Sequence, residues 1–302
     1  MLDERLTEQR NSLSKNIDRL SPVEIVEVIN REDAGVAIEV GREAKAIARA
    51  VELAVAAFRA GGRLIYVGAG TSGRLGVLDA AEMPPTFGTD PEMVQGAIAG
   101  GLEALVRSQE GAEDRPGDGA AAMDERAVTG KDLVIGIATS GTTPYVHGAL
   151  ARARELGART GFILCTPPPR ALRDCHDVVI APLTGPEVIT GSTRMKAGTA
   201  TKMVLNTITT AAMVLLGKVH GNLMVDLQVS CRKLQDRGER ILMVTLGLDR
   251  ADAREMLALA GGHVKTALAM HRLQVGAHEA RKAMDEVNGV VNALASPEAD
   301  GG

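Results

Sequence analysis

Two short apolar runs, each followed directly by a loop of glycine, serine and threonine, most constrain the fold of this chain. The first run is 63–67 with its loop at 68–73, and the second is 132–138 with its loop at 139–143. An apolar run of this length bounded by turn residues is typical of a buried strand, and a helical pattern follows each loop. Such strand–loop–helix units predict right-handed βαβ crossovers and a parallel sheet.

Three further apolar stretches complete the predicted sheet, at 93–99, 160–165 and 176–181. Helices are expected between the strands. Ser21 and Pro22 have the pattern of a helix start, and a long alanine-rich helix is expected at 34–60. A further helix is expected at 102–113, and another follows the loop at 139–143 and ends near 156. The sequence therefore predicts an α/β fold with a doubly wound parallel five-stranded sheet flanked by helices.

The C-terminal part of the chain has only helical patterns. A long helical stretch is expected at 189–234, and short helices are expected at 239–246, 251–260 and 264–271. We expect a first domain at 1–237, with an N-terminal helical arm, and a small all-helical C-terminal domain at 238–302.

Composition narrows the class of protein. Hydrophobic residues make up 45% of the chain and aromatic residues 2%, which suits helices closely packed on a parallel sheet. A net charge of -4 with scattered cations argues against nucleic acid as a partner. The N-terminus lacks the apolar segment of a signal peptide, and stretch 203–216 is too short and polar to span a membrane. The cysteines, Cys165, Cys175 and Cys231, are odd in number and widely spaced, so we expect reduced thiols and a cytoplasmic protein.

The two loops after the strands are candidate anion sites. The carboxyl ends of parallel strands meet at one edge of a sheet, where hydroxyls and backbone N–H groups at helix N-termini bind phosphate. The candidate phosphate ligands in these loops are Thr71, Ser72, Ser140, Thr142 and Thr143. Capping of the following helices is the alternative role, but it does not account for three hydroxyls in the second loop.

The first loop also matches the GxGxxG pattern of dinucleotide-binding folds. That pattern requires an acidic residue at the end of the second strand, whereas Asp90 precedes the predicted strand. A phosphorylated small molecule is therefore favoured over a nucleotide.

Several charged residues are candidates for chemistry. Glu82 lies directly before Met83, Pro84 and Pro85, which are expected to end its helix, and Glu110 and Glu113 share a helical face. By itself, Glu82 fits a solvated surface residue better than a catalytic one, because most glutamates are solvated. Glu110 and Glu113 also fit a solvated helix end, although negative charge there opposes the helix dipole. Near the long C-terminal helical stretch, a further group can complete an anion site or cap the helix: Glu187, Ser192, Arg194 and Lys196. The histidines have no metal-binding spacing, so no metal site is predicted.

Taken together, these stretches resemble the N-acetylmuramic acid 6-phosphate etherases, a family of sugar-isomerase (SIS) domain proteins related to the glucokinase regulatory protein. The resemblance runs from about residue 7 to 235, and the matching segments are TEQRN at 7–11, 61–88, EGAED at 110–114, 138–150, 185–206 and 217–226. Small departures are Met83 where the family often has cysteine, His220 where tyrosine is usual, and CTPPP after the fourth strand.

The resemblance implies cleavage of a D-lactyl ether in the recycling of bacterial cell-wall sugar, with no metal or redox cofactor. It implies a homodimer with sites near the interface, and it makes Glu82 and Glu113 the catalytic pair. We assign Glu82 as the acid at the ether oxygen and Glu113 as the base at C2. A phosphosugar isomerase and a non-catalytic phosphosugar-binding regulator are the alternatives on the same fold.

Overall fold

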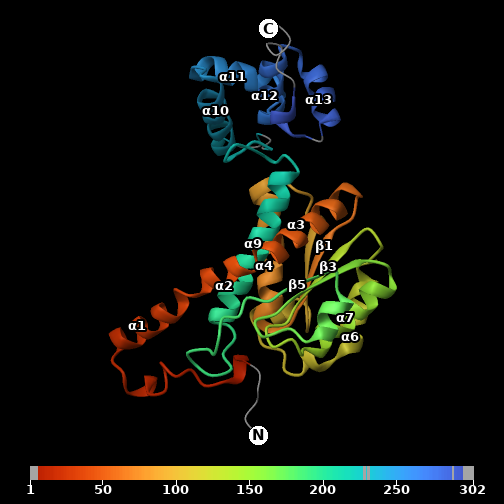
Figure 1. Cartoon of the computed structure of the whole chain (residues 1–302). Helices are drawn as coiled ribbons and strands as arrows, with labels where there is room; N and C mark the ends of the chain where they lie inside the picture. Colours follow the sequence, from red (N-terminus) through yellow and green to blue (C-terminus); the bar gives the residue numbers. More distant parts are fainter. Residues whose placement is uncertain (1–5, 227–228, 230–231, 288, 295–302) are drawn as a thin grey trace. The chain divides into compact units, whose positions relative to one another are not determined.

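The structure, a computed structural model, describes residues 6–226, 229, 232–287 and 289–294 (Figure 1). Its main sheet is parallel throughout and has the order β2-β1-β3-β4-β5. The strands are β1 Leu64–Gly68, β2 Val94–Ile98, β3 Leu133–Ile137, β4 Arg159–Ile163 and β5 Val178–Ile180. Each lies within or next to a predicted apolar run, so the predicted five-stranded parallel sheet is confirmed.

The strand order reverses direction at β1. The chain leaves β1 for β2 on one side and then returns to place β3 on the other side. In the register, Gly68 at the end of β1 pairs with Ile137 at the end of β3. The two polar loops therefore leave the sheet next to each other, at the kind of switch point where open α/β sheets bind ligands.

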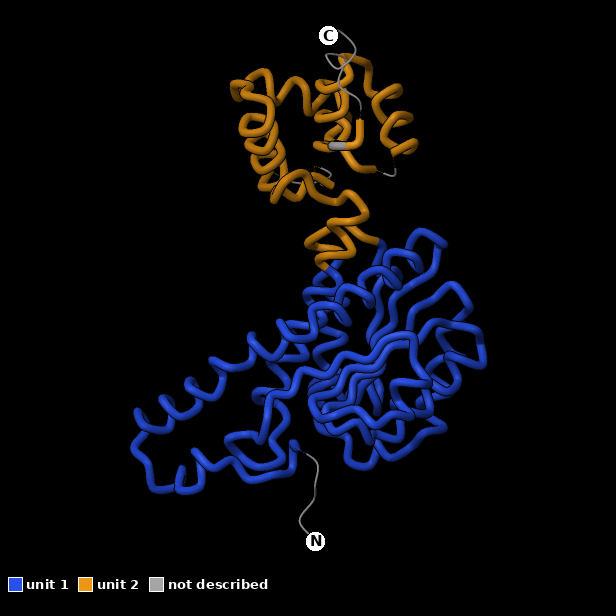
Figure 2. The backbone as a smooth tube through the Cα atoms, in the orientation of Figure 1, with its two compact units in different colours: residues 1–83, 90–209 blue, residues 84–89, 210–302 orange. Residues whose placement is uncertain are grey.

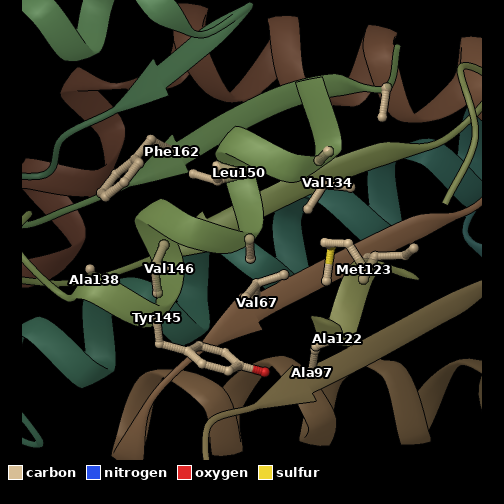
Figure 3. Packing of buried hydrophobic residues seen from close by; sticks show 14 of the residues in the cluster. Val67, Ala97, Ala122, Met123, Val134, Ala138, Tyr145, Val146, Leu150 and Phe162 are labelled. Atoms are coloured by element: carbon tan, nitrogen blue, oxygen red, sulfur yellow. The ribbon is translucent and has the colours of Figure 1, made fainter. Parts of the chain in front are cut away.

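The core on one face of the sheet lies under α6 (Pro116–Glu125) and α7 (Pro144–Glu155). Figure 3 shows Val67, Val134 and Phe162 from the strands packed against Val146 and Leu150 of α7. All of these side chains are buried. The opposite face contacts α3 (Ala44–Arg59) through β1, β3 and β5.

Glycines allow α6 and α7 to cross at backbone contact distance. A Cβ at Gly119 would lie 2.0 Å from the carbonyl oxygen of Tyr145, and one at Gly148 would lie 2.0 Å from that of Pro116. Any side chain larger than hydrogen would overlap the backbone of the other helix, so the crossing requires glycine at both positions.

The N-terminal helices differ in part from the prediction. Helix α1 (Pro22–Asp33) starts as expected, with a capping box between Ser21 and Glu24. The single helix predicted at 34–60 is wrong, because α2 (Val36–Arg42) and α3 are separated at Glu43, whose backbone leaves the helical conformation.

Two other predicted helices are also wrong. The stretch 102–113 contains only α5 (Glu103–Val106) and the start of the 3₁₀ turn Ala112–Asp114, after Gly111 with φ 72°. The stretch 189–234 contains α9 (Lys196–Leu215), a hairpin of β6 (Val219–His220) and β7 (Leu223–Met224), and the start of α10 (Arg232–Leu246). Positive φ angles at Gly217 and Gly221 interrupt the helical path there.

The proline pair does not end the helix that carries Glu82. Helix α4 runs from Gly70 to Phe87 and includes Pro84 and Pro85 in its last turns. Proline lacks an N–H, so each one removes a helical hydrogen bond without stopping the chain from completing the turn. The helix ends at Gly88, which has φ 61° and donates its N–H to the Pro84 carbonyl at 2.9 Å.

The chain divides into two compact units, coloured separately in Figure 2. The first comprises residues 1–83 and 90–209, and the second comprises 84–89 and 210–302. The predicted boundary at 237/238 falls inside α10. In the second unit α10 packs with α11 (Arg250–Leu259) and α12 (Val264–Leu273). Helix α13 (Ala277–Glu286), which was not predicted, packs against α12.

In the part of the chain that the structure describes, no helix is long and apolar enough to cross a membrane. Cys165 is a buried free thiol and Cys175 an exposed one, while Cys231 lies outside the described residues.

The α6–α7 crossing gives a stability prediction. We expect Gly148→Ala to destabilise the protein by about 1–3 kcal/mol, because the new methyl group would overlap the Pro116 backbone. Gly117→Ala on α6 is the matched control, since a Cβ there has no neighbour within 4 Å. It should be stabilising by up to about 1 kcal/mol through helix propensity. Urea unfolding followed by circular dichroism measures both, and equal stability of the two variants would contradict the packing argument.

Candidate active site

The first loop of the site is a tight turn from β1 into α4. A Cβ at Gly68 would lie 2.7 Å from the Gly73 nitrogen, and one at Gly73 would lie 2.7 Å from the Gly68 carbonyl oxygen. The absence of both side chains lets the first turn of α4 start directly above the end of the strand. Thr71 and Ser72 lie in this turn, where the free N–H groups and the helix dipole favour an anion.

The second loop joins β3 to α7 and presents hydroxyls in a fixed arrangement. The hydroxyls of Ser140 and Thr142 lie 2.9 Å apart, and the Ser140 Oγ accepts from the Thr142 N–H at 3.4 Å. His147 Nε2 lies 2.8 Å from the Gly141 carbonyl oxygen. Thr143 is the N-cap residue of α7 but makes no side-chain capping hydrogen bond. Capping therefore does not explain this threonine.

A cavity of about 500 Å³ joins the two loops. Six of the predicted site residues line it: Thr71, Ser72, Glu113, Ser140, Thr142 and Thr143. The cavity thus combines hydroxyl groups, the N-termini of two helices and a carboxylate. Helix N-termini and hydroxyls are neutral ligands suited to a phosphate group.

Glu113 comes to the cavity from the loop that follows α5. It lies in the short 3₁₀ turn Ala112–Asp114 and is exposed. It lines the main cavity, and together with Glu110 it also lines a smaller adjoining one. A carboxylate beside the two hydroxyl loops is placed to exchange a proton with a molecule in the cavity.

Glu82 does not line the cavity. It is an exposed residue twelve positions after Gly70 on α4, which at 1.5 Å per residue places it about 18 Å along the helix. Glu113 lines both cavities, whereas Glu82 lines neither of them.

Two of the other predicted residues are engaged inside the protein. The Glu187 carboxylate is fully buried and accepts hydrogen bonds from the backbone N–H groups of Lys196 at 3.0 Å and Ala197 at 2.9 Å. Burial raises the pKa of Glu187, and these two hydrogen bonds act against the rise. Lys196 is 4% exposed and its Nζ lies 2.5 Å from Glu32 Oε2. These residues stabilise the start of α9 and its contact with α1.

Ser192 and Arg194 are not among the residues that line the cavity, although their neighbours Gly191 and Thr193 are. Glu8 also lines the cavity and was not singled out from the sequence. The N-terminal arm is held there because the Gly191 N–H donates to the Thr7 carbonyl at 3.2 Å. The sequence signal for the role of the N-terminal arm at the cavity was the TEQRN segment at 7–11, whose first residue, Thr7, is buried.

Comparison with known proteins identifies the relatives of this chain. The family described as glucokinase regulatory protein N-terminal SIS domain matches residues 46–154. An N-acetylmuramic acid 6-phosphate etherase from Salinibacter ruber is 56% identical over 96% of this chain and 93% of its own length. One from Thermosynechococcus vestitus is 55% identical over 88% of this chain and 86% of its own length. One from a Geobacillus species is 50% identical over 96% of this chain and 98% of its own length. This chain therefore belongs to the N-acetylmuramic acid 6-phosphate etherase family, with a sheet of the SIS type.

Proposed function

We propose that this protein is a lyase that cleaves the D-lactyl ether of N-acetylmuramic acid 6-phosphate. The products are N-acetylglucosamine 6-phosphate and D-lactate, in the recycling of cell-wall sugar. The observation that carries this proposal is the cavity at the β1/β3 switch point, which joins both hydroxyl loops to Glu113. The identity of at least 50% to named etherases over nearly the whole chain supports the same reaction.

The two loops supply a binding site for the 6-phosphate. Thr71 and Ser72 lie at the N-terminus of α4, and Ser140, Thr142 and Thr143 precede α7. Hydroxyl and N–H donors at two helix N-termini can contact several phosphate oxygens at once. Such binding would fix the distal end of the open-chain sugar and bring its C2 near Glu113.

The chemistry is an elimination followed by addition of water. In the open-chain sugar the C1 aldehyde acidifies the C2 proton, which Glu113 removes as the base. The C3–O bond breaks as an acid, Glu82, gives its proton to the ether oxygen, and D-lactate leaves. Water then adds to C3 of the unsaturated aldehyde, and a proton returns to C2. These steps need proton transfer by two carboxyl groups and no redox change or metal.

The position of Glu82 favours a site that two copies of the chain complete. Since Glu82 lies about 18 Å along α4 from the loop, we propose a homodimer in which Glu82 of one copy serves the cavity of the other. A two-fold dimer places each residue twice, so both sites would be completed in the same way.

We place the reaction in the bacterial cytoplasm. The odd number of widely spaced cysteines suits a reducing compartment. The phosphorylated substrate also suits an intracellular reaction.

The proposed roles of the two glutamates predict different partial reactions. Glu113→Gln should lose both D-lactate release and exchange of the substrate C2 proton with solvent, each by about 10²–10⁴-fold. Glu82→Gln should lose lactate release by a similar factor while C2 exchange in D₂O, followed by NMR, continues. If Glu82→Gln lost C2 exchange while Glu113→Gln kept it, the acid and base roles would be reversed. Full activity in either variant would exclude that residue from the catalytic pair.

Mixed dimers test whether Glu82 acts across the interface. Refolding Glu82→Gln and Glu113→Gln chains together in equal amounts should restore about a quarter of wild-type lactate release. The reason is that half of randomly paired dimers would be mixed, and each mixed dimer would have one intact site. Each variant refolded alone is the control. No recovery in mixtures shown to exchange subunits would place both glutamates in one chain.

The phosphate site predicts a difference between two serines. Ser140→Ala should raise the KM for N-acetylmuramic acid 6-phosphate by about 10-fold or more, because it removes a hydrogen bond to a charged group. Ser192→Ala is the matched control, since Ser192 does not line the cavity, and its KM should stay near that of wild type. Steady-state kinetics of lactate release measures both. A larger effect at Ser192 would move the phosphate site toward the start of α9.

A further inference from the structure

The proposed substrate carries two anionic groups, a phosphate and the carboxylate of its lactyl group. The 500 Å³ cavity offers hydroxyls and N–H groups for the phosphate, but its charged lining is acidic. Glu8, Glu113 and Asp114 line it, and no lysine or arginine does so among the residues that the structure describes. A second anion beside these carboxylates would be repelled unless a cation lies close to it.

A smaller cavity of about 70 Å³ adjoins the main one and contains such a cation. The two cavities share Ala69, Gly70 and Glu113 in their linings, so they meet at the catalytic glutamate. Arg74 lines the smaller cavity only, where Glu110 and Glu113 are the acidic residues of the lining. The volume is several times the ~10–15 Å³ that a cavity needs to hold one water molecule, so a carboxylate has room in it.

Arg74 is held in a fixed orientation. It lies one turn after Gly70 on α4 and is half-buried. Its Nε donates a hydrogen bond to the Leu105 carbonyl of α5 at 3.1 Å. That bond occupies one edge of the guanidinium group and leaves both Nη atoms without a partner among the described residues. A guanidinium anchored in this way can bind a carboxylate through two parallel hydrogen bonds.

The order of groups along the substrate matches the order of residues along the two cavities. The lactyl ether is attached at C3, next to the C2 atom whose proton Glu113 would remove. Glu113 lines both cavities, and Arg74 lies in the side cavity. A sugar with its phosphate at the hydroxyl loops and its C2 at Glu113 would therefore have the lactyl group next to the side cavity.

We propose that Arg74 binds the carboxylate of the lactyl group in this side cavity, and the proposal rests on the etherase function above. The contact distinguishes the substrate from its sugar product, which lacks the lactyl group. It also orients the C3–O bond for elimination, because a bound carboxylate restricts rotation about that bond.

The test compares two substrates in the full-length protein. One is N-acetylmuramic acid 6-phosphate, and the other is the 3-O-isopropyl ether of N-acetylglucosamine 6-phosphate, in which a methyl group replaces the carboxylate. Arg74→Met should lower kcat/KM for the lactyl ether by about 10–100-fold, the range expected for a hydrogen-bonded charge. For the isopropyl ether, kcat/KM should change by less than about 3-fold relative to wild type.

Two controls accompany this comparison. Arg107→Met removes an exposed arginine that directly follows α5 and lines neither cavity, and it should leave the kinetics of both substrates unaffected. Binding of N-acetylglucosamine 6-phosphate, measured by thermal shift, should be the same for Arg74→Met as for wild type. That result would show that the variant is folded and keeps its phosphate site.

The outcomes separate this proposal from the function on which it rests. Equal losses of Arg74→Met on both ethers would mean that Arg74 acts only by holding α5, and would overturn the proposal while leaving the etherase function intact. Unchanged kinetics on the lactyl ether would overturn it as well. A wild-type protein that releases no lactate would overturn the proposed function and this subsite together.

Discussion

The close approach of Gly68 and Gly73 is the constraint on which the site depends. With a side chain at either position, the start of α4 and the end of β1 could not lie within their observed distance. A wider turn would move Thr71 and Ser72 away from the hydroxyls of the neighbouring loop. It would also move Arg74, which follows on the same helix. The geometry of this one turn therefore determines the positions of Thr71 and Ser72, the proposed phosphate donors, and of Arg74, the proposed ligand of the lactyl carboxylate.

The opposite side of the cavity depends on a buried carboxylate. Glu187 occupies the N-terminus of α9, where two backbone N–H groups offset the cost of burying its charge. Lys196 starts the same helix and contacts Glu32 of α1, to which Asn11 also donates at 2.6 Å. This network joins the N-terminal arm to the segment before α9, and so it holds Glu8 and Thr193 at the cavity.

The sequence predicts well what is determined locally. The five strands and the two hydroxyl loops follow from apolar runs and turn residues, and the start of α1 follows from Ser21 and Pro22. Contacts between residues distant in sequence are not visible in a local pattern. The partner of Lys196 is Glu32, 164 residues away, so the sequence does not show that this lysine is buried against α1.

Local backbone changes that the helical pattern does not reveal account for the helices that were placed wrongly. In stretch 189–234 the breaks include the positive-φ glycines Gly217 and Gly221, whereas α5 ends at Arg107 in an extended conformation and α2 ends at Glu43. Glycine within an apolar or alanine-rich stretch does not reveal its φ, because it is tolerated in a helix at a cost of only about 1 kcal/mol. The reverse holds at Pro84 and Pro85, where local chemistry predicts an end but α4 continues to Phe87.

The choice of neutral donors for the phosphate has a consequence for the base. A lysine in the main cavity would bind phosphate, but it would also pair with a nearby carboxylate and weaken that carboxylate as a proton acceptor. Hydroxyls and helix N-termini bind the anion without a mobile cation beside Glu113. Arg74 is compatible with this arrangement because α5 holds its guanidinium in the side cavity through Leu105. In the proposed mechanism, the separation of Arg74 from the hydroxyl loops would let one site bind two anions while Glu113 removes a proton.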